Sequence, residues 1–243
     1  MKLTFAAVTL AITCLAVSAE PLPLVTGNDY APFADQKLPE GGMTVELVKA
    51  ALKESKVEFA IHWQPWARGL HETRSGKFAA TFPYLKTPER EQDFLYSRPI
   101  YAIEDWLFAK PNAGLDPNNL GSLEGKKICL PLGWAPAAKL VPMIKSGAIK
   151  QEQPKDISTC VRMVSAGRAD FFVTDQFQGS AAIAGTGVTN VTKSSYSVGS
   201  AALYLITSKS FSQGKSLIDA FNQGLAALKK SGEFDRIVAK HTK

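Results

Sequence analysis

Short apolar runs alternate along the chain with segments whose apolar residues recur at helical spacing, and this alternation restricts the fold more than any other feature. Residues 57–63 alternate apolar and polar side chains, which is typical of a half-buried strand. Residues 43–54 have the spacing of an amphipathic helix. Because both patterns recur to the C-terminus, the sequence predicts an α/β fold.

The predicted elements fall into two blocks, separated by a loop rich in Pro, Asn and Gly at 111–125. The stretch 194–200 is rich in Ser and Gly and is predicted as a connection. The expected strands are 22–26, 57–63, 77–82, 101–110, 126–132, 149–153, 170–175 and 202–208, and the expected helices are 43–54, 65–76, 135–147, 156–167, 176–185, 211–230 and 233–241.

The elements after the second block are too few to form a third domain, so we expect them to pack on the first block. This predicts two lobes joined by two crossings, near 104–110 and 197–204. We expect residues 20–107 and 204–243 to form lobe 1, and 108–203 to form lobe 2. Two crossings suit a hinge that closes the lobes around a ligand.

The first nineteen residues have the pattern of a secretory signal. Lys2 supplies the positive charge, an apolar run follows from Leu3 to Val17, and small residues end at Ala19 before Glu20. That run is short for a membrane span, and no later stretch reaches about 18 apolar residues. We therefore expect cleavage after Ala19 and export, with a lipid anchor at Cys14 disfavoured by the Thr13 before it.

Two cysteines follow the signal, Cys129 in a predicted strand and Cys160 in a predicted helix. An even count in an exported chain favours a disulfide, and the alternative is two separate buried thiols. The three histidines are dispersed and give no metal-ligand spacing with the cysteines, so we expect no metal site.

The composition excludes several classes of function. The formal net charge is +6, but the basic residues are scattered without aromatic interleaving, so we expect no nucleic-acid partner. The segments GSLEGKK and GTGV lack residues that phosphate and dinucleotide loops require, and no G-x-S-x-G occurs. We expect no cofactor and no catalytic residue.

The segment TFPYLKTPERE, residues 81–91, leads from a buried strand into a loop bracketed by prolines. It presents one arginine, Arg90. A guanidinium at the end of a strand is compatible with an anion-binding cleft. The alternative is an ordinary solvated arginine in a surface loop.

Six segments occur in the order in which they are found in one family. They are DYAPF, GGMTVELVKAAL, LKTPERE followed by FLYSRPIY, LEGKKICLPLG, AGRADFFVTD and GEFDRIVAKH. On these segments the whole chain after the signal resembles the bacterial extracellular solute-binding proteins of ABC transporters, in the family that binds polar amino acids. The resemblance implies the type 2 periplasmic binding protein fold, a periplasmic location, a monomer and an ABC transporter permease as partner.

The resemblance also implies roles for particular residues. Arg90 matches the arginine that binds the ligand α-carboxylate, and Asp175 matches the acidic residue that binds the α-ammonium group. Asp175 could instead, or in addition, cap the following helix. Tyr30 is expected in the pocket wall. Gly133 and Trp134 match the place where the family offers backbone N–H groups at a helix N-terminus, with the helix expected to begin at Ala135.

The chain departs from the family pattern at three positions. Leu85 replaces a serine or threonine that contacts the ligand, Pro83 replaces a small or hydroxyl residue, and Trp134 replaces a hydroxyl residue. We therefore expect a more apolar pocket, with Tyr84, Trp66 and Trp134 as further lining residues. Trp66 could alternatively only attach its helix to the sheet.

These observations predict an exported protein that captures a small amino-acid-like or carboxylate-bearing ligand by lobe closure. One alternative is an enzyme on the same scaffold, similar to cyclohexadienyl dehydratase, which would need a proton-transfer group in the cleft, such as a glutamate or His71. Another is a ligand-sensing partner of a membrane receptor.

Overall fold

The computed structural model describes residues 20–242, so the predicted signal segment 1–19 lies outside the described residues. Within the described range, no helix is both long enough and apolar enough to cross a membrane. The strands are β1 (Leu22–Thr26), β2 (Phe59–Trp63), β3 (Ala80–Leu85), β4 (Phe94–Tyr96), β5 (Tyr101–Ala109), β6 (Lys127–Cys129), β7 (Lys150–Glu152), β8 (Phe171–Asp175) and β9 (Thr192–Ser208).

The helices alternate with these strands, as the sequence predicts. They are α1 (Met43–Glu54), α2 (Trp66–Arg74), α3 (Pro88–Asp93), α4 (Val141–Lys145), α5 (Ile157–Ser165), α6 (Gln176–Thr186), α7 (Gly214–Ser231) and α8 (Glu233–His241), with short 3-10 turns at Pro39–Gly41, Leu120–Leu123 and Ala138–Leu140.

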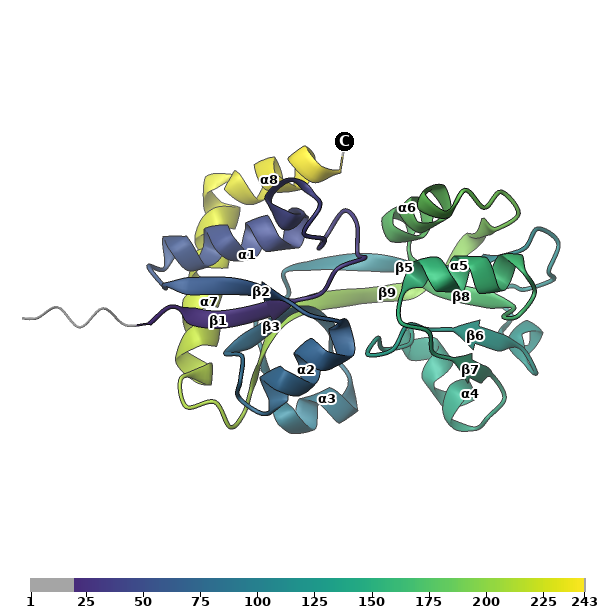
Figure 1. The fold of residues 1–243 in the computed structure, drawn as a ribbon, viewed down its shortest axis with the longest axis horizontal. Helices are drawn as coiled ribbons and strands as arrows, with labels where there is room; N and C mark the ends of the chain where they lie inside the picture. Colours follow the sequence, from purple (N-terminus) through teal and green to yellow (C-terminus); the bar gives the residue numbers. More distant parts are fainter. Residues whose placement is uncertain (1–19, 243) are drawn as a thin grey trace, which may run out of the picture.

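Two long strands connect the two ends of the molecule (Figure 1). The strand order is β2-β1-β3-β9-β5-β8-β6-β7, and β4 pairs with β9. The antiparallel pair β5 and β9 is in register from Tyr101 opposite Leu203 to Ala109 opposite Thr192, with two irregularities. At one end β9 pairs with β3, and at the other end β5 pairs with β8. The two strands therefore provide both crossings between the lobes.

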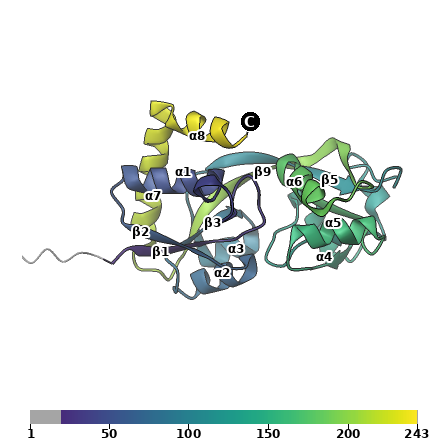
Figure 2. The same ribbon diagram turned by 45° about the horizontal axis from the view of Figure 1, so that its top comes forward.

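The chain forms two lobes (Figure 2). Each lobe has its own hydrophobic core. The core of the first lobe packs α1 and α7 against β1 and β3, with Leu24, Leu47, Phe82 and Phe221 fully buried. The second lobe has apolar clusters on both faces of β6 and β8. Since each lobe buries its own core, the two have an independent basis for stability.

The strand β9 is longer than the sequence predicts. Residues 194–200 were expected as a connection because of their Ser and Gly content, but β9 runs without a break from Thr192 to Ser208. The reason is tertiary: β5 supplies backbone partners along this stretch, including Asp105 opposite Gly199. Pairing with a long neighbour overrides the weak strand propensity of Ser and Gly.

The helix expected from Ala135 begins later. Residues 131–137 are irregular, a 3-10 turn follows at Ala138–Leu140, and α4 covers only Val141–Lys145. Pro136 disfavours the helical region for Ala135, and Pro142 lies in the first turn of α4, where it has no N–H to donate to an earlier turn.

Cys129, the last residue of β6, and Cys160 of α5 form a disulfide, with their Cα atoms 5.4 Å apart. Both residues are fully buried. The bridge predicted from the sequence is present, and it attaches α5 to the sheet of the second lobe.

Candidate ligand-binding site

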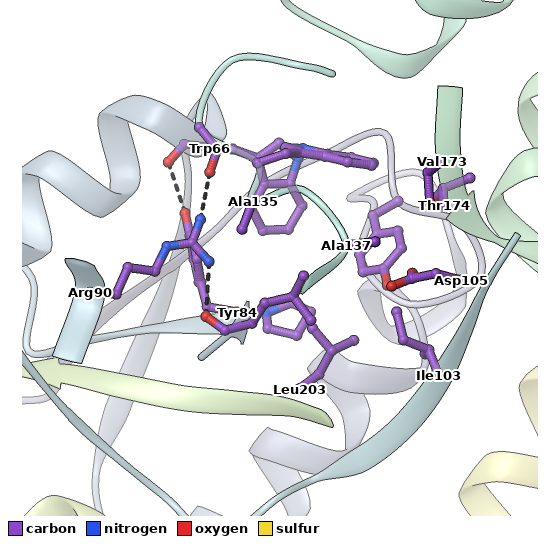
Figure 3. Close-up of a pocket in the computed structure, with 15 residues that line it drawn as sticks. Trp66, Tyr84, Arg90, Ile103, Asp105, Ala135, Ala137, Val173, Thr174 and Leu203 are labelled. Atoms are coloured by element: carbon purple, nitrogen blue, oxygen red, sulfur yellow. Dashed lines mark hydrogen bonds between the residues drawn. The ribbon is translucent and has the colours of Figure 1, made fainter. Parts of the chain in front are cut away.

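A pocket lies where the two lobes meet, and Figure 3 shows it in close-up. Its cavity volume is about 70 Å³, which is enough for several water molecules or a small organic group. The lining comes from both lobes and from the two connecting strands: Tyr30, Trp66, Pro83, Tyr84, Leu85, Arg90, Ile103, Asp105, Gly133, Trp134, Ala135, Ala137, Val173, Thr174 and Leu203.

Arg90 is buried in this pocket and not solvated. It lies in the first turn of α3, whose N-cap Thr87 accepts a hydrogen bond from the Arg90 backbone N–H. Only 8% of the residue is exposed. Its Nη1 donates to the Leu85 carbonyl at 2.9 Å, and its Nη2 donates to the Gly133 carbonyl at 2.8 Å. The second bond crosses from the first lobe to the second.

The Arg90 guanidinium keeps further binding capacity. Its carbon lies 4.9 Å from the centre of the Tyr84 ring, a cation–π distance. Burial lowers the pKa of Arg90 from its ordinary value, but a guanidinium stays charged in proteins. Of about five N–H donors on an arginine, the two backbone carbonyls occupy two. The remaining N–H groups of this side chain make no hydrogen bond within residues 20–242.

Four aromatic side chains form the wall. The centre of the Tyr30 ring lies 6.1 Å from that of Trp66 and 5.9 Å from that of Trp134. The Trp66 indole N–H donates to the Asn28 carbonyl, and the Tyr84 hydroxyl donates to the Trp66 carbonyl, each at 2.8 Å. Because these bonds occupy their polar atoms, the Trp66 and Tyr84 rings present mainly carbon to the pocket. This agrees with the more apolar pocket expected from the sequence.

A carboxylate that the sequence analysis missed also lines the pocket. Asp105 lies in the middle of β5, is 7% exposed, and stands opposite Asp175 of β8. Burial, followed by the charge of Asp175, raises the pKa of Asp105 from 3.8 to about 7. Figure 3 shows Asp105 on the opposite side of the pocket from Arg90.

Asp175 is buried but is not among the pocket-lining residues. Its Oδ1 accepts the backbone N–H groups of Phe177 and Gln178, so Asp175 caps α6. Its Oδ2 has no hydrogen-bond partner among residues 20–242, although the Tyr30 hydroxyl is close enough to influence the pKa of the carboxyl. Burial is the main reason why the pKa of Asp175 is raised to about 6.

The structure thus brings together seven of the eight ligand-binding residues predicted from the sequence: Arg90, Tyr30, Tyr84, Leu85, Trp66, Gly133 and Trp134. The eighth, Asp175, does not line the pocket. Asp105 was not predicted, although the sequence carried a signal for it: it shares its strand face with Tyr101, Ile103 and Leu107. An aspartate on the inward face of a strand requires an explanation.

The prediction that Gly133 and Trp134 offer N–H groups at a helix N-terminus is wrong. Neither residue precedes a helix directly, and the Trp134 N–H donates to the Pro131 carbonyl in a turn. Gly133 instead contributes its carbonyl oxygen, to Arg90. A side chain at Gly133 would collide with the first lobe, because an added Cβ would lie 2.6 Å from the Ala67 nitrogen.

Other polar contacts join the lobes beside the pocket. Asp29 Oδ2 accepts the Ile157 N–H at the start of α5 at 3.0 Å, and the Asp29 carbonyl accepts from Gln178 at 2.7 Å. An exposed ion pair joins Lys145 to Glu89 at 2.7 Å. The lobes are therefore in contact around the pocket.

Comparison with known structures identifies the fold. A histidine kinase sensor domain with similarity to periplasmic binding proteins matches with a TM-score of 0.79 at 20% identity, covering 91% of this chain and 96% of that one. An amino acid ABC transporter substrate-binding protein from Streptococcus pneumoniae, bound to L-arginine, gives 0.75 at 20% identity, covering 91% and 94%.

An ancestral amino acid-binding protein, a precursor of cyclohexadienyl dehydratase, gives 0.72 at 23% identity, covering 92% of this chain and 95% of that one. At these identities the likeness shows the fold alone, and it confirms the two-lobed α/β architecture of type 2 periplasmic binding proteins. No curated protein matches by sequence. The profile of the bacterial extracellular solute-binding proteins, family 3, matches residues 22–243, so the chain belongs to that family.

Proposed function

We propose that this protein captures a small amino-acid-like or other carboxylate-bearing molecule in the pocket between its lobes. The observation that carries the proposal is Arg90, a charged fork buried in a pocket that both lobes line. A buried guanidinium without a carboxylate partner is costly, and a ligand carboxylate is the group that its planar geometry fits best.

The energetics of such a complex are adequate. Each hydrogen bond between charged groups contributes roughly 1.5–3 kcal/mol. Micromolar affinity requires about 8 kcal/mol. Two bonds to Arg90, together with apolar contact to Trp66 and Trp134, reach this range. Because Arg90 also donates to Gly133 of the second lobe, ligand binding and lobe contact are linked through one side chain.

The biological setting follows from the family. We infer that residues 1–19 are a cleaved export signal, that the protein acts as a monomer in the periplasm, and that it delivers its ligand to an ABC transporter permease. The arginine-bound relative from Streptococcus pneumoniae supports a role in amino acid transport. We further propose that the lobes comprise residues 20–107 with 204–243 and residues 108–203.

A thermal-shift screen with the twenty free L-amino acids and small carboxylic acids tests the proposal. At least one compound should raise Tm in the native protein. Arg90→Ala should weaken its binding by about 100-fold or more, since two charge-assisted bonds are lost. Arg90→Lys keeps the charge but not the fork, and should weaken binding less.

Arg98→Ala is the matched control, because Arg98 is exposed on the same lobe and away from the pocket. It should bind like the native protein. If the best compound stabilises Arg90→Ala and Arg90→Lys as much as the native protein, carboxylate capture by Arg90 is wrong.

A second function is favoured by Asp105, a buried carboxyl group that lines the pocket and whose pKa is raised to about 7 by burial and by the charge of Asp175. A buried carboxyl that titrates near neutrality suits general acid–base catalysis. His71, by contrast, is exposed and outside the pocket. A dehydratase on this scaffold would convert cyclohexadienyl carboxylates, so NMR of such compounds incubated with the protein distinguishes turnover from binding alone.

A further inference from the structure

Asp105 is a buried carboxyl group without a protein countercharge. None of residues 20–242 forms an ion pair or a hydrogen bond with its side chain, although the residue is only 7% exposed and lines the pocket. Burying an unpaired carboxylate is strongly unfavourable. Either a proton or a cationic partner must therefore neutralise it.

The neighbours of Asp105 increase this demand. On β8 the residue opposite is Asp175, whose Oδ2 is itself buried and has no hydrogen-bond partner in the described part of the chain. Residues opposite each other on antiparallel strands have Cβ atoms about 4.5–5.5 Å apart. On β9 the residue opposite is Gly199, which has no side chain. The nearest basic residue along that strand, Lys193, lies over the Trp106 ring instead.

Two tyrosines lie near this pair. Tyr30 interacts with both carboxyl groups and Tyr101 interacts with Asp175, and both tyrosines stay neutral because burial raises their pKa above the ordinary value. The Tyr30, Trp66 and Trp134 rings approach one another at the same pocket. Aromatic faces attract cations, and the effect is largest when water is excluded. The carboxyl pair and the rings therefore both favour a positively charged group of the ligand.

We propose that Asp105 binds an ammonium group of the ligand, with Asp175 as a second negative charge behind it. This inference rests on the proposed function and adds the ligand's second charged group. The ligand would extend from Arg90, which holds its carboxylate, to Asp105 on the opposite side of the pocket (Figure 3). The ammonium contact of this chain would thus come from β5, whereas the family resemblance assigns it to Asp175 of β8.

A consequence is that binding releases a proton. In the empty protein the carboxyl pair is partly protonated near neutral pH, since the pKa of Asp105 is about 7. An ammonium group favours the ionised pair and displaces the proton. Between pH 6 and pH 8 the ionised fraction rises about tenfold, so affinity should rise by about the same factor.

Calorimetric titration with matched probes tests this inference. The probes are the twenty L-amino acids, the amines that lack their carboxylate and the acids that lack their amino group. The best amino acid should bind the native protein about 10- to 100-fold more tightly than its deaminated acid. Asp105→Asn should remove this preference and the rise in affinity with pH.

Glu104→Gln is the matched control, because it makes the same change of charge at an exposed neighbour of Asp105. It should keep both effects. If Asp105→Asn binds the amino acid as tightly as the native protein, with the same pH dependence, Asp105 is not the ammonium contact, while carboxylate capture by Arg90 stands.

Failure of carboxylate capture by Arg90 alone would give a different result. If amines bind in an Asp105-dependent manner, while the acids do not bind and Arg90→Lys has no effect, the ammonium site stands and carboxylate capture is wrong. If no amino acid or amine binds the native protein at millimolar concentration, the inference is overturned.

Discussion

Replacing Asp105 by asparagine should make the stability of the ligand-free protein less dependent on pH. The asparagine side chain has nearly the same shape as aspartic acid but cannot ionise. In the native protein, burial and the charge of Asp175 raise the pKa of Asp105 to about 7 from an ordinary 3.8. The folded state therefore holds a proton that the unfolded chain releases at lower pH.

The sign and size of the effect follow from linkage. Below pH 3.8 the carboxyl is protonated in both states and has no effect on pH dependence. As pH rises towards 7, the unfolded chain ionises first, so the free energy of unfolding falls. A shift of about 3 units corresponds to about 4 kcal/mol. Water that enters the pocket on ionisation would reduce this, so the value is an upper bound.

Urea unfolding at pH 5 and pH 8, followed by tryptophan fluorescence, measures the effect. Between these two values the Asp105 contribution should fall by about 2–3 kcal/mol in the native protein, and Asp105→Asn should lack that fall. Glu104→Gln should behave like the native protein, because Glu104 is exposed. Equal pH dependence in the native protein and Asp105→Asn would refute the argument that Asp105 is buried without a countercharge.

Two further predictions concern the second lobe. The double variant Cys129→Ser and Cys160→Ser should lower the free energy of unfolding by about 3–4 kcal/mol in urea, since the bridge spans 31 positions, and the native protein should show no thiol reactive to alkylation at these residues. Gly179→Ala should lower the free energy of unfolding by about 1–3 kcal/mol, because an added Cβ would lie 2.0 Å from the Phe108 ring. Gly185→Ala in the same helix is the control: its Cβ would meet nothing within 4 Å, so it should be neutral or slightly stabilising. Equal Tm values for the two variants would contradict the packing of α6 on β5.

The sequence predicted the elements best where their patterns are local. The strand 22–26 has the predicted bounds, and so does the amphipathic helix 43–54. The disulfide was also predictable, from two cysteines left in an exported chain. One prediction failed where the environment decides, because β9 gains its first ten residues from pairing with β5. Another failed for a local reason, because Pro136 and Pro142 keep α4 from beginning at Ala135.

The candidate site divides in the same way. The sequence by itself determined that the chain would form an α/β fold of two blocks, and that Arg90 would follow a buried strand at a position suited to an anion. The tertiary structure alone decided that Arg90 meets the Gly133 carbonyl of the other lobe. It also decided that Asp105 faces Asp175. The physical reason is that periodicity reports which face of one element is apolar, whereas the charge environment of a buried group depends on strand register between segments far apart in the chain.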